Sequence, residues 1–397
     1  MKKLLLLGGS KYILPVIETA HKLGVYVITC DYLPDNIAHK YSDEYHNVSI
    51  IEKDQVLNLA KELEIDGIMS FACDPGVVTA AYVAEKMGLP FAGSYESVSI
   101  LQNKAKFRKF LAENGFNVPL AKGYSNADDA LKDAQLFNWP VIVKPVDSAG
   151  SKGVTKVEEP SKLKESIEYA LSFSHSNEFI VEEFIEKLGD SSDSDGFSID
   201  GELVFASFSN QKFDIKADNP YTPAAYTWPS SMPEETQDDL RKQLQKLFSL
   251  LNLKTSIYNI ETRQGTDGKG YIMEVSPRGG GNRLSEMLKY ACGTDLIKNA
   301  VLASVGETCD NLQHPEYTCH LAECIIHSSK TGVFKEMKID PKLNVVENDL
   351  WVKPGDTVKT FTGANEAIGT LVLKFDTREE MENTVDNIEK FIEIVVK

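Results

Sequence analysis

The chain has 397 residues, of which 42% are hydrophobic and 25% are charged, and its formal net charge is −17. Such totals are typical of a globular protein with a sizeable core and about two to four domains. The acidic balance excludes general binding to nucleic acids or to anionic membrane surfaces, because both require a basic face. A local basic pocket for a phosphorylated ligand remains compatible with it.

The first residues resemble neither a signal peptide nor a membrane anchor. The apolar run after Lys3 contains only four leucines before Gly8, and no later segment reaches the ~18 apolar residues of a membrane span. Six cysteines are scattered along the chain without a C-x-x-C pair, so we expect reduced core cysteines rather than disulfides or zinc ligands. We therefore expect a cytoplasmic protein.

The first part of the chain alternates apolar runs with helical periodicity. A run at 3–9 ends in Gly-Gly-Ser, a helical stretch follows at 11–23, and a second run covers 25–31. This order predicts a β-α-β unit, and similar units continue. We predict an open parallel α/β domain over residues 1–95. The turn sequence GGSKYI lacks the G-x-G-x-x-G spacing, which argues against a hydride-transfer enzyme with a dinucleotide cofactor.

The next segments place lysines beside a glycine-rich loop. Residues 96–116 predict a helical linker that carries Lys104, although a solvated helix face explains most of its basic residues. Residues 141–143 predict a buried strand, and Lys144 at its end must find an anion or reach water. In the following loop, 147–154, backbone N–H groups can cradle phosphate oxygens. Gly-Ser runs are also typical of simple turns.

A strand that ends in two acidic residues comes next. We predict that the polar segment 188–196 is a solvated, mobile loop. Residues 196–213 predict a hairpin that turns at Asp200–Gly201 and places Lys212 at the end of its returning strand. The proline- and aromatic-rich segment 214–233 lacks periodicity, so we expect an irregular loop that forms a wall of the substrate pocket.

A second hairpin carries the most informative residues. Apolar runs at 257–260 and 271–275 flank the polar turn TDGKG, which is typical of an antiparallel hairpin. If the strands pair across this turn, Glu261 and Glu274 project from one face and repel each other unless a cation lies between them. Hard oxygen ligands suit magnesium bridging to phosphates. Arg278 and three glycines follow, and they offer a forked cation and a backbone that an anion can approach. The alternative is a surface hairpin with two solvated glutamates.

The remaining chain predicts a small α+β domain over residues 311–397 without catalytic features. Short strands alternate with turns, and the chain is predicted to end in a helix that begins with the capping box Thr377-x-x-Glu380 and continues through Ile392.

Taken in order, these features resemble the ATP-grasp superfamily over essentially the whole chain. The chain looks most like the ligases that join a carboxylate to an amine, including the L-amino-acid ligases. The resemblance implies an α/β and α+β multidomain fold in which a two-lobe ATP-grasp domain follows the N-terminal domain and the linker. Its N-terminal lobe would cover residues 117–183, and its C-terminal lobe with the metal site would cover residues 184–310.

The resemblance also implies roles for individual residues. Those expected to bind the nucleotide are Lys104 and Lys144 on the ATP phosphates, Gly150, Ser151 and Gly153 in the phosphate-covering flap, and Glu182, Glu183, Phe184 and Ile185 in the hinge that meets adenine. Those expected to act at the reaction centre are Glu261 and Glu274 as magnesium ligands and Arg278, assisted by Lys212, at the transferred phosphoryl group or the acyl phosphate.

Two positions depart from the family pattern. The family commonly has asparagine two residues after the second glutamate, where this chain has Ser276, so we expect Ser276 to be a weaker or water-mediated metal ligand. A ribose-binding acid is expected after the hinge, in a G-x-E context. Here the segment reads Gly189-Asp190-Ser191, so either Asp190 substitutes for this acid or the contact is absent.

The residues and the resemblance predict the same chemistry: an ADP-forming carboxylate–amine ligase that uses ATP and Mg²⁺ and passes through an acyl phosphate. The expected substrates are small-molecule carboxylates and amines such as amino acids, and family habit suggests a homodimer. Two alternatives remain open. One is an ATP-grasp enzyme that activates bicarbonate or another acceptor. The other is a nucleotide-binding regulatory protein without turnover, for which Ser276 is the only hint.

Overall fold

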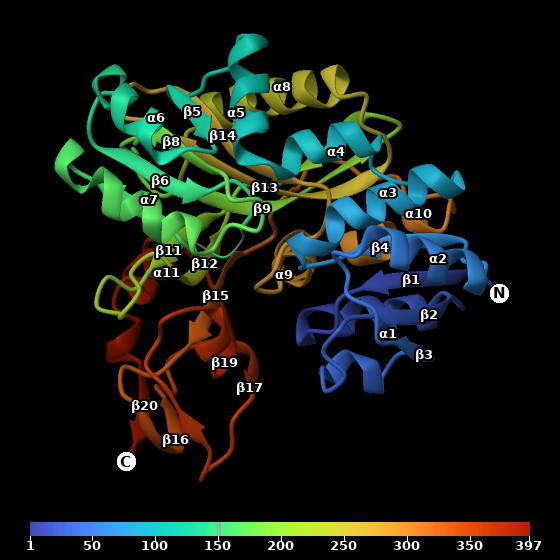
Figure 1. Cartoon of the computed structure of the whole chain (residues 1–397). Coiled ribbons are helices and arrows are strands. Elements are labelled where there is room, and N and C mark those ends of the chain that lie inside the picture. Colours follow the sequence, from blue (N-terminus) through green and yellow to red (C-terminus); the bar gives the residue numbers. More distant parts are fainter. Residues whose placement is uncertain (149, 151) are drawn as a thin grey trace.

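The computed structural model describes residues 1–148, 150 and 152–397. Its N-terminal part is a parallel sheet of order β3-β2-β1-β4, as predicted (Figure 1). The four leucines of β1 are fully buried, as is typical of a parallel strand covered on both faces. The strands are β1 (Lys3–Leu7), β2 (Tyr26–Cys30), β3 (Glu44–His46) and β4 (Gly67–Ser70), and the helices are α1 (Leu14–Lys22), α2 (Lys53–Leu63) and α3 (Val77–Met87).

Two helices lead from this sheet into a small antiparallel sheet of order β5-β8-β6-β7. Helices α6 and α7 contribute to the same hydrophobic cluster as β6 and β8. The linking helices are α4 (Tyr95–Gln102) and α5 (Lys104–Glu113). The other elements are β5 (Ala121–Tyr124), α6 (Ala127–Lys132), β6 (Val141–Pro145), β7 (Thr155–Val157), α7 (Leu163–Leu171) and β8 (Phe179–Glu183).

A second antiparallel sheet, of order β10-β9-β13-β14, lies at the centre of the molecule. The predicted amphipathic helix α8 (Glu234–Leu250) packs on it through a stripe of buried residues that includes Leu240 and Leu244. In Figure 1 this helix lies at the top, above β14. The strands are β9 (Ser192–Ile199), β10 (Glu202–Ala206), β13 (Ser256–Gln264) and β14 (Gly270–Ser276), followed by helices α9 (Leu284–Cys292) and α10 (Leu296–Ser304).

The C-terminal strands complete two further sheets, of order β11-β12-β15-β19-β17 and β18-β16-β20. Because β12 pairs with β15, strands on either side of residue 310 share one sheet. The elements are β11 (Asn210–Phe213), β12 (Pro223–Trp228), β15 (His320–Ile326), β16 (Gly332–Ile339), β17 (Val345–Leu350), β18 (Thr357–Val358), β19 (Gly369–Phe375), α11 (Arg378–Val385) and β20 (Ile392–Val396).

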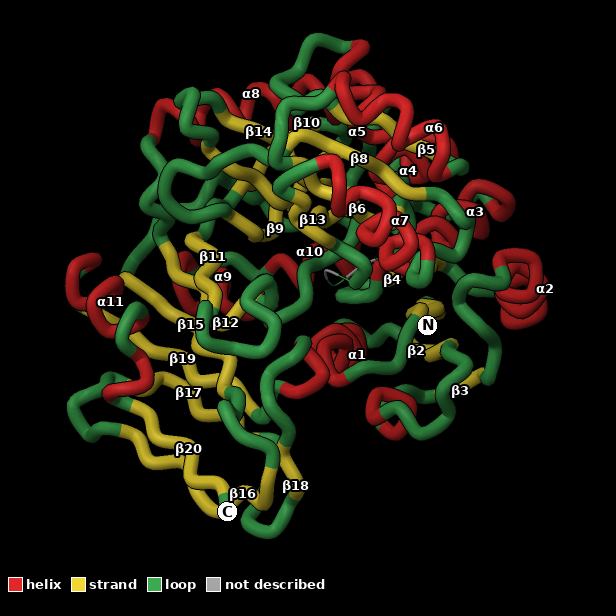
Figure 2. The backbone as a smooth tube through the Cα atoms, turned by 60° about the vertical axis from the view of Figure 1, so that its left-hand side comes forward, coloured by secondary structure: helices red, strands yellow, loops and turns green. Residues whose placement is uncertain are grey.

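The N-terminal sheet and the C-terminal strands lie on the same side of the central sheet (Figures 1 and 2). A direct contact joins the two regions: the Lys11 ammonium, on the 3₁₀ turn η1 (Lys11–Ile13), lies 2.7 Å from the centre of the Trp351 ring. Within the described ranges, we find no helix with the length and apolar character needed to cross a bilayer.

Segment 188–196, predicted to be a mobile, solvated loop, instead enters β9 at Ser192, and β9 lies between β10 and β13. The prediction was wrong because polar residues usually indicate solvent exposure, whereas here they bond to neighbouring strands. Ser194 is fully buried, and its hydroxyl donates a hydrogen bond of 2.9 Å to Ser207 Oγ.

Three further predictions need correction. Lys212 lies on β11, in a different sheet from the hairpin β9–β10 to which it was assigned. The segment 214–233 is not irregular throughout, because β12 lies within it and buries Trp228 completely. The final helix ends at Val385, and Ile392 begins a strand, because β20 pairs with β16 instead of extending the helix.

Candidate active site

The hairpin β13–β14 places its two glutamates directly opposite each other. Glu261 and Glu274 are register partners, and Glu261 is also the partner of Asp193 on β9. Opposite residues of antiparallel strands lie on the same face. Asp193, Glu261 and Glu274 therefore form one row of carboxylates across three strands, of which sequence analysis identified two.

This crowding of carboxylates alters their ionisation. Burial raises the pKa of Glu261 to about 7, and the neighbouring Asp193 and Glu274 act in the same direction. Burial likewise raises the pKa of Asp193 to about 6. Since a bound cation would favour the charged forms, the donor set fits a hard divalent ion. Among the residues that the structure describes, no group of three His, Cys, Asp or Glu side chains is placed to hold a metal alone. Ligand oxygens or water would therefore have to complete the coordination.

Lys104 connects this carboxylate row to the loop after β6. It is the first residue of α5, where the side chain of Asn103 caps the helix by accepting from the Lys106 N–H. Its ammonium lies 3.6 Å from Glu274 Oε2 and donates to the Ser148 carbonyl oxygen at 2.9 Å. A phosphate bound near the row would therefore meet a preplaced cation.

Lys144 finds its anion inside the protein. Its ammonium donates to the carboxylate of Glu182 on β8, and Arg108 Nε donates to the other oxygen of Glu182 at 2.8 Å. Burial alone would raise the pKa of Glu182, but Arg108 and Lys144 lower it to about 2. Burial lowers the pKa of Lys144. The buried group thus has two cations for one anion, which leaves positive charge for a phosphate.

Replacing Glu182 by glutamine is expected to lower the free energy of unfolding by about 3 kcal/mol at neutral pH, because two buried cations lose their counter-ion. The folded-state pKa of Glu182, about 2, is below its ordinary value of 4.5. This stabilisation is therefore present above about pH 4.5 and is lost as the pH falls towards 2. Urea unfolding of both proteins across this range checks the prediction, and a difference that does not shrink in acid would contradict it.

Three of the predicted hinge residues, Glu183, Phe184 and Ile185, form hydrogen bonds within the protein. The side chain of Glu183 accepts hydrogen bonds of 2.8 Å from both the backbone N–H and the side-chain amide of Asn138. The Phe184 N–H donates to the Pro140 carbonyl oxygen at 3.0 Å. The Ile185 carbonyl oxygen accepts from Arg263 Nη1 at 3.0 Å. These bonds fix the path of the chain after β8, where adenine contacts were predicted.

Of the predicted flap, Gly150 and Gly153 have positive φ angles of +68° and +71°, which favour glycine. A Cβ on Gly153 would also come within 3.1 Å of Pro145 and Phe173. Ser151, the remaining predicted flap residue, lies outside the described residues.

Arg278 forms a two-point ion pair with Asp74, which precedes α3. Its Nε and Nη2 donate to the two carboxylate oxygens at 2.6 and 2.8 Å. Ser276, predicted as a metal ligand, donates to the same Asp74 carboxylate at 3.1 Å and accepts from Gln102 Nε2 at 2.8 Å. The Ser276 hydroxyl thus links the hairpin to the N-terminal region and to α4, and its role as a metal ligand stays a prediction.

Lys212 and Asp190 form an ion pair of 2.9 Å, and Lys212 also contacts Asp386 at 3.1 Å. A predicted catalytic residue and a predicted ribose contact are thus bonded to each other. The contact with Asp190 joins β11 to the segment before β9, and the contact with Asp386 joins β11 to the end of α11.

Sequence analysis missed several polar residues around the hairpin. Asn259 Nδ2 donates to Asp193 at 2.7 Å, and the Tyr226 hydroxyl donates to the other oxygen of Asp193 at 3.1 Å. Asp195 accepts from the backbone N–H of Gly280 at 2.8 Å. A Cβ on Gly280 would lie 2.9 Å from Asp195, which explains the glycine at this position. In the sequence, the alternating D-S-D pattern at 193–195 was the signal that could have pointed to Asp193 and Asp195.

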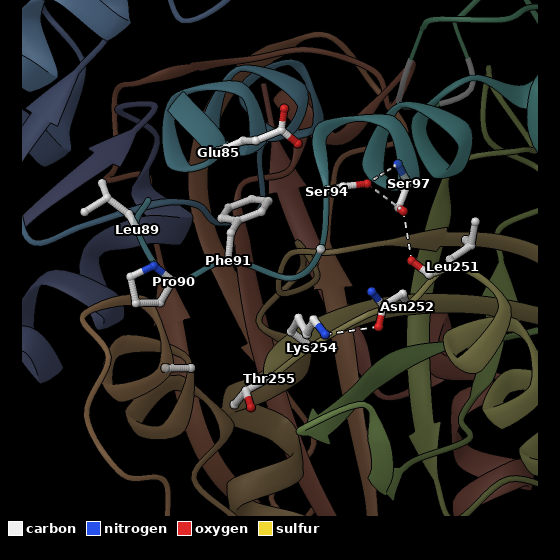
Figure 3. A pocket seen from close by; sticks show the side chains of 12 residues that line it. Glu85, Leu89, Pro90, Phe91, Ser94, Ser97, Leu251, Asn252, Lys254 and Thr255 are labelled. Carbon is white, nitrogen blue, oxygen red and sulfur yellow. Dashed lines mark hydrogen bonds between the residues drawn. The ribbon is translucent and has the colours of Figure 1, made fainter. Parts of the chain in front are cut away.

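A cavity of about 480 Å³ lies elsewhere, between the end of α3 and the end of α8 (Figure 3). None of the predicted site residues lines it. Its polar groups already bond to one another: Lys254 donates to Asn252 at 3.0 Å and Ser97 donates to the Leu251 carbonyl oxygen at 2.8 Å. The candidate active site is therefore the carboxylate row with its lysines.

Comparison with known proteins identifies the family of one segment of the chain. Residues 137–286 match the ATP-grasp domain family. The chain therefore carries an ATP-grasp domain, and the class predicted from its motifs is confirmed. The chain is 23% identical over 319 residues to the C-terminal section of the carbamoyl phosphate synthase large chain from Aquifex aeolicus. That alignment covers 80% of this chain but 58% of the relative, so the chain spans less than two thirds of the relative's length.

Solved structures share the fold along the whole chain. The L-amino acid ligase from Bacillus licheniformis has a TM-score of 0.81 at 20% identity and is covered to 99%, with 100% of this chain covered. The biotin carboxylase domain dimer of 2-oxoglutarate carboxylase from Hydrogenobacter thermophilus, solved with MgADP, ADP and bicarbonate, has a TM-score of 0.75 at 15% identity. It is covered to 91%, again with 100% of this chain. At these identities the comparison establishes the ATP-grasp fold, as predicted.

Proposed function

We propose that this protein is an ATP-dependent, ADP-forming ligase that joins a small carboxylate to an amine. The observation that carries the proposal is the cross-strand pair of Glu261 and Glu274 with the Lys104 ammonium 3.6 Å from Glu274. A magnesium ion would offset the repulsion between Glu261 and Glu274, and the neighbouring lysines would pair with phosphate oxygens. The arrangement therefore suits a magnesium–nucleotide complex. The relatedness to carbamoyl phosphate synthase and the shared fold with an L-amino acid ligase add support.

The proposed reaction has two steps. A carboxylate oxygen of the substrate attacks the γ-phosphorus of ATP, and the bond to the β-phosphate oxygen breaks to release ADP. The amine nitrogen then attacks the acyl carbon, phosphate leaves, and the nitrogen loses a proton. Glu261 and Glu274 would hold magnesium, which when bound offsets phosphate charge.

The chain's own cations would act on the developing charge. Lys104 and Lys144 would bind phosphate oxygens through their ammonium groups, and Glu182 orients Lys144. Arg278 is held by Asp74 through two hydrogen bonds and donates a third to the Gly279 carbonyl oxygen, so two of its five N–H groups would remain for the predicted contact with the phosphoryl group. Asp74 is therefore proposed as a positioning residue.

A second candidate function is the activation of bicarbonate. The structural relative from Hydrogenobacter thermophilus is described as a complex with bicarbonate, and this observation favours the alternative. The same relative is described as a dimer, which supports the predicted homodimer. Sedimentation of the purified chain would test that state.

Analysis of nucleotide products tests the function. We expect ADP and phosphate from ATP and magnesium only when a carboxylate and an amine are both present. ADP release with bicarbonate alone would favour the second candidate. AMP and pyrophosphate would overturn the acyl-phosphate mechanism, and tight ATP binding without turnover on any substrate would indicate the regulatory alternative.

A further inference from the structure

Glu323 on β15 is a buried carboxyl group that the proposed reaction does not use. Its side chain has no exposed surface, and within the described part of the chain neither of its oxygens has a hydrogen-bond partner. Leaving such a group unpaired in the interior is costly, so an unpaired buried carboxyl indicates a partner that binds there.

The sheet places Glu323 beside the candidate active site. Glu323 is the register partner of Tyr226 on β12, so both side chains lie on the same face. The Tyr226 hydroxyl donates to Asp193, and Asp193 is the register partner of Glu261. One tyrosine and one aspartate thus connect Glu323 to the proposed magnesium ligand.

The surroundings of Glu323 carry an excess of negative charge. Arg283 is the cation whose charge acts on Glu323. Its guanidinium is already bonded to Glu286 at 3.0 Å, to Glu347 at 2.7 Å and to the Thr370 hydroxyl at 2.9 Å. Glu286 and Glu347 therefore occupy the Arg283 guanidinium, and the third carboxyl group, that of Glu323, has no bond to it. The chemistry of the site favours a cation and disfavours a substrate carboxylate.

We propose that Glu323 binds the ammonium group of the amine substrate, an inference that rests on the proposed ligase function. An ammonium group offers three donors on a compact positive charge, enough for both carboxylate oxygens. One of its protons would pass to Glu323, which frees the nitrogen's electron pair for attack on the acyl carbon, and the proton released after the attack would leave with the phosphate. A metal ion is the poorer occupant, because Glu286 and Glu347 are already bonded to Arg283 and Glu323 alone would offer it ligand oxygens. The bound amine would lie beside Tyr226, whose hydroxyl donates to Asp193.

The amine must reach a group that is closed to solvent, so its binding requires a local opening of the structure around Glu323.

The test compares charged and uncharged nucleophiles in the wild type and in Glu323→Gln. Glutamine has the same shape but cannot pair with an ammonium group. We expect the KM for the amine to rise at least ~30-fold. Hydroxylamine, which is mostly uncharged at mildly alkaline pH, should still trap the acyl phosphate as a hydroxamate within about threefold of the wild-type rate. Glu323→Asp, which keeps the charge, should restore part of the amine affinity.

The control is Glu336→Gln, which removes an exposed glutamate from β16 and should change neither reaction. Equal loss with both nucleophiles, or no loss with either, would overturn the assignment of Glu323.

A binding measurement separates this inference from the ligase proposal. Calorimetry without ATP, using the common L-amino acids, ethanolamine and putrescine as probes, should detect an amine that binds the wild type and not Glu323→Gln. Equal binding to both proteins, or binding to neither, would overturn the assignment. Absence of ADP and hydroxamate in the wild type would instead count against the ligase function alone.

Discussion

Glu274→Gln is expected to reduce ADP formation by about 10²–10³-fold while the fold is retained. Glu274 lies opposite Glu261 and 3.6 Å from the Lys104 ammonium, so it contacts both the proposed metal and a phosphate-binding lysine. Glutamine keeps the shape of the side chain and removes its charge. Repulsion with Glu261 is also removed, so the melting temperature without ligands should be unchanged or higher.

The matched control for this variant is Glu202→Gln, which changes an exposed glutamate on the edge strand β10 of the same sheet. Its ADP formation should equal that of the wild type. Coupled assays of ADP release at saturating magnesium, together with thermal melting, measure both effects. Wild-type turnover by Glu274→Gln would remove the carboxylate pair from the mechanism.

Arg278→Met is expected to lower the free energy of unfolding by about 3–5 kcal/mol and to abolish turnover. Only 8% of Arg278 is exposed, and its loss leaves the Asp74 carboxylate without the guanidinium that pairs with it. Burial alone would raise the pKa of Asp74, but Arg278 holds it below the ordinary value. Urea unfolding at neutral pH measures the loss of stability.

The double variant Arg278→Met with Asp74→Asn separates stability from chemistry. Removing the second charge should restore most of the stability, because no unpaired ion then remains between the N-terminal region and the hairpin. ADP formation should not return, since the phosphoryl contact is still missing. Recovery of turnover in the double variant would show that Arg278 acts only by pairing with Asp74.

Several elements could be predicted from the sequence because their signals are local. The parallel sheet at the N-terminus was indicated by apolar runs alternating with helical periodicity, and the hairpin β13–β14 by an Asp-Gly turn between alternating strands. Opposed placement of Glu261 and Glu274 followed from that turn. The capping box also predicted the start of α11, where the Thr377 side chain accepts from the Glu380 N–H.

Other features were inaccessible to local reasoning because their partners lie far away along the chain. Arg108 and Glu182 are 74 residues apart, and Arg278 and Asp74 are 204 apart, so no spacing in the sequence reveals either pair. The first half of β9, residues 192–195, was missed for the same reason, since its polar side chains are satisfied by neighbouring strands. Periodicity and turn chemistry act over a few residues, whereas burial and ion pairing depend on which distant strands come together. Hence the amino-acid order alone indicated the ATP-grasp class and its main lysines and glutamates. The folded chain determined which charges meet, and it left Glu323 buried without a bond.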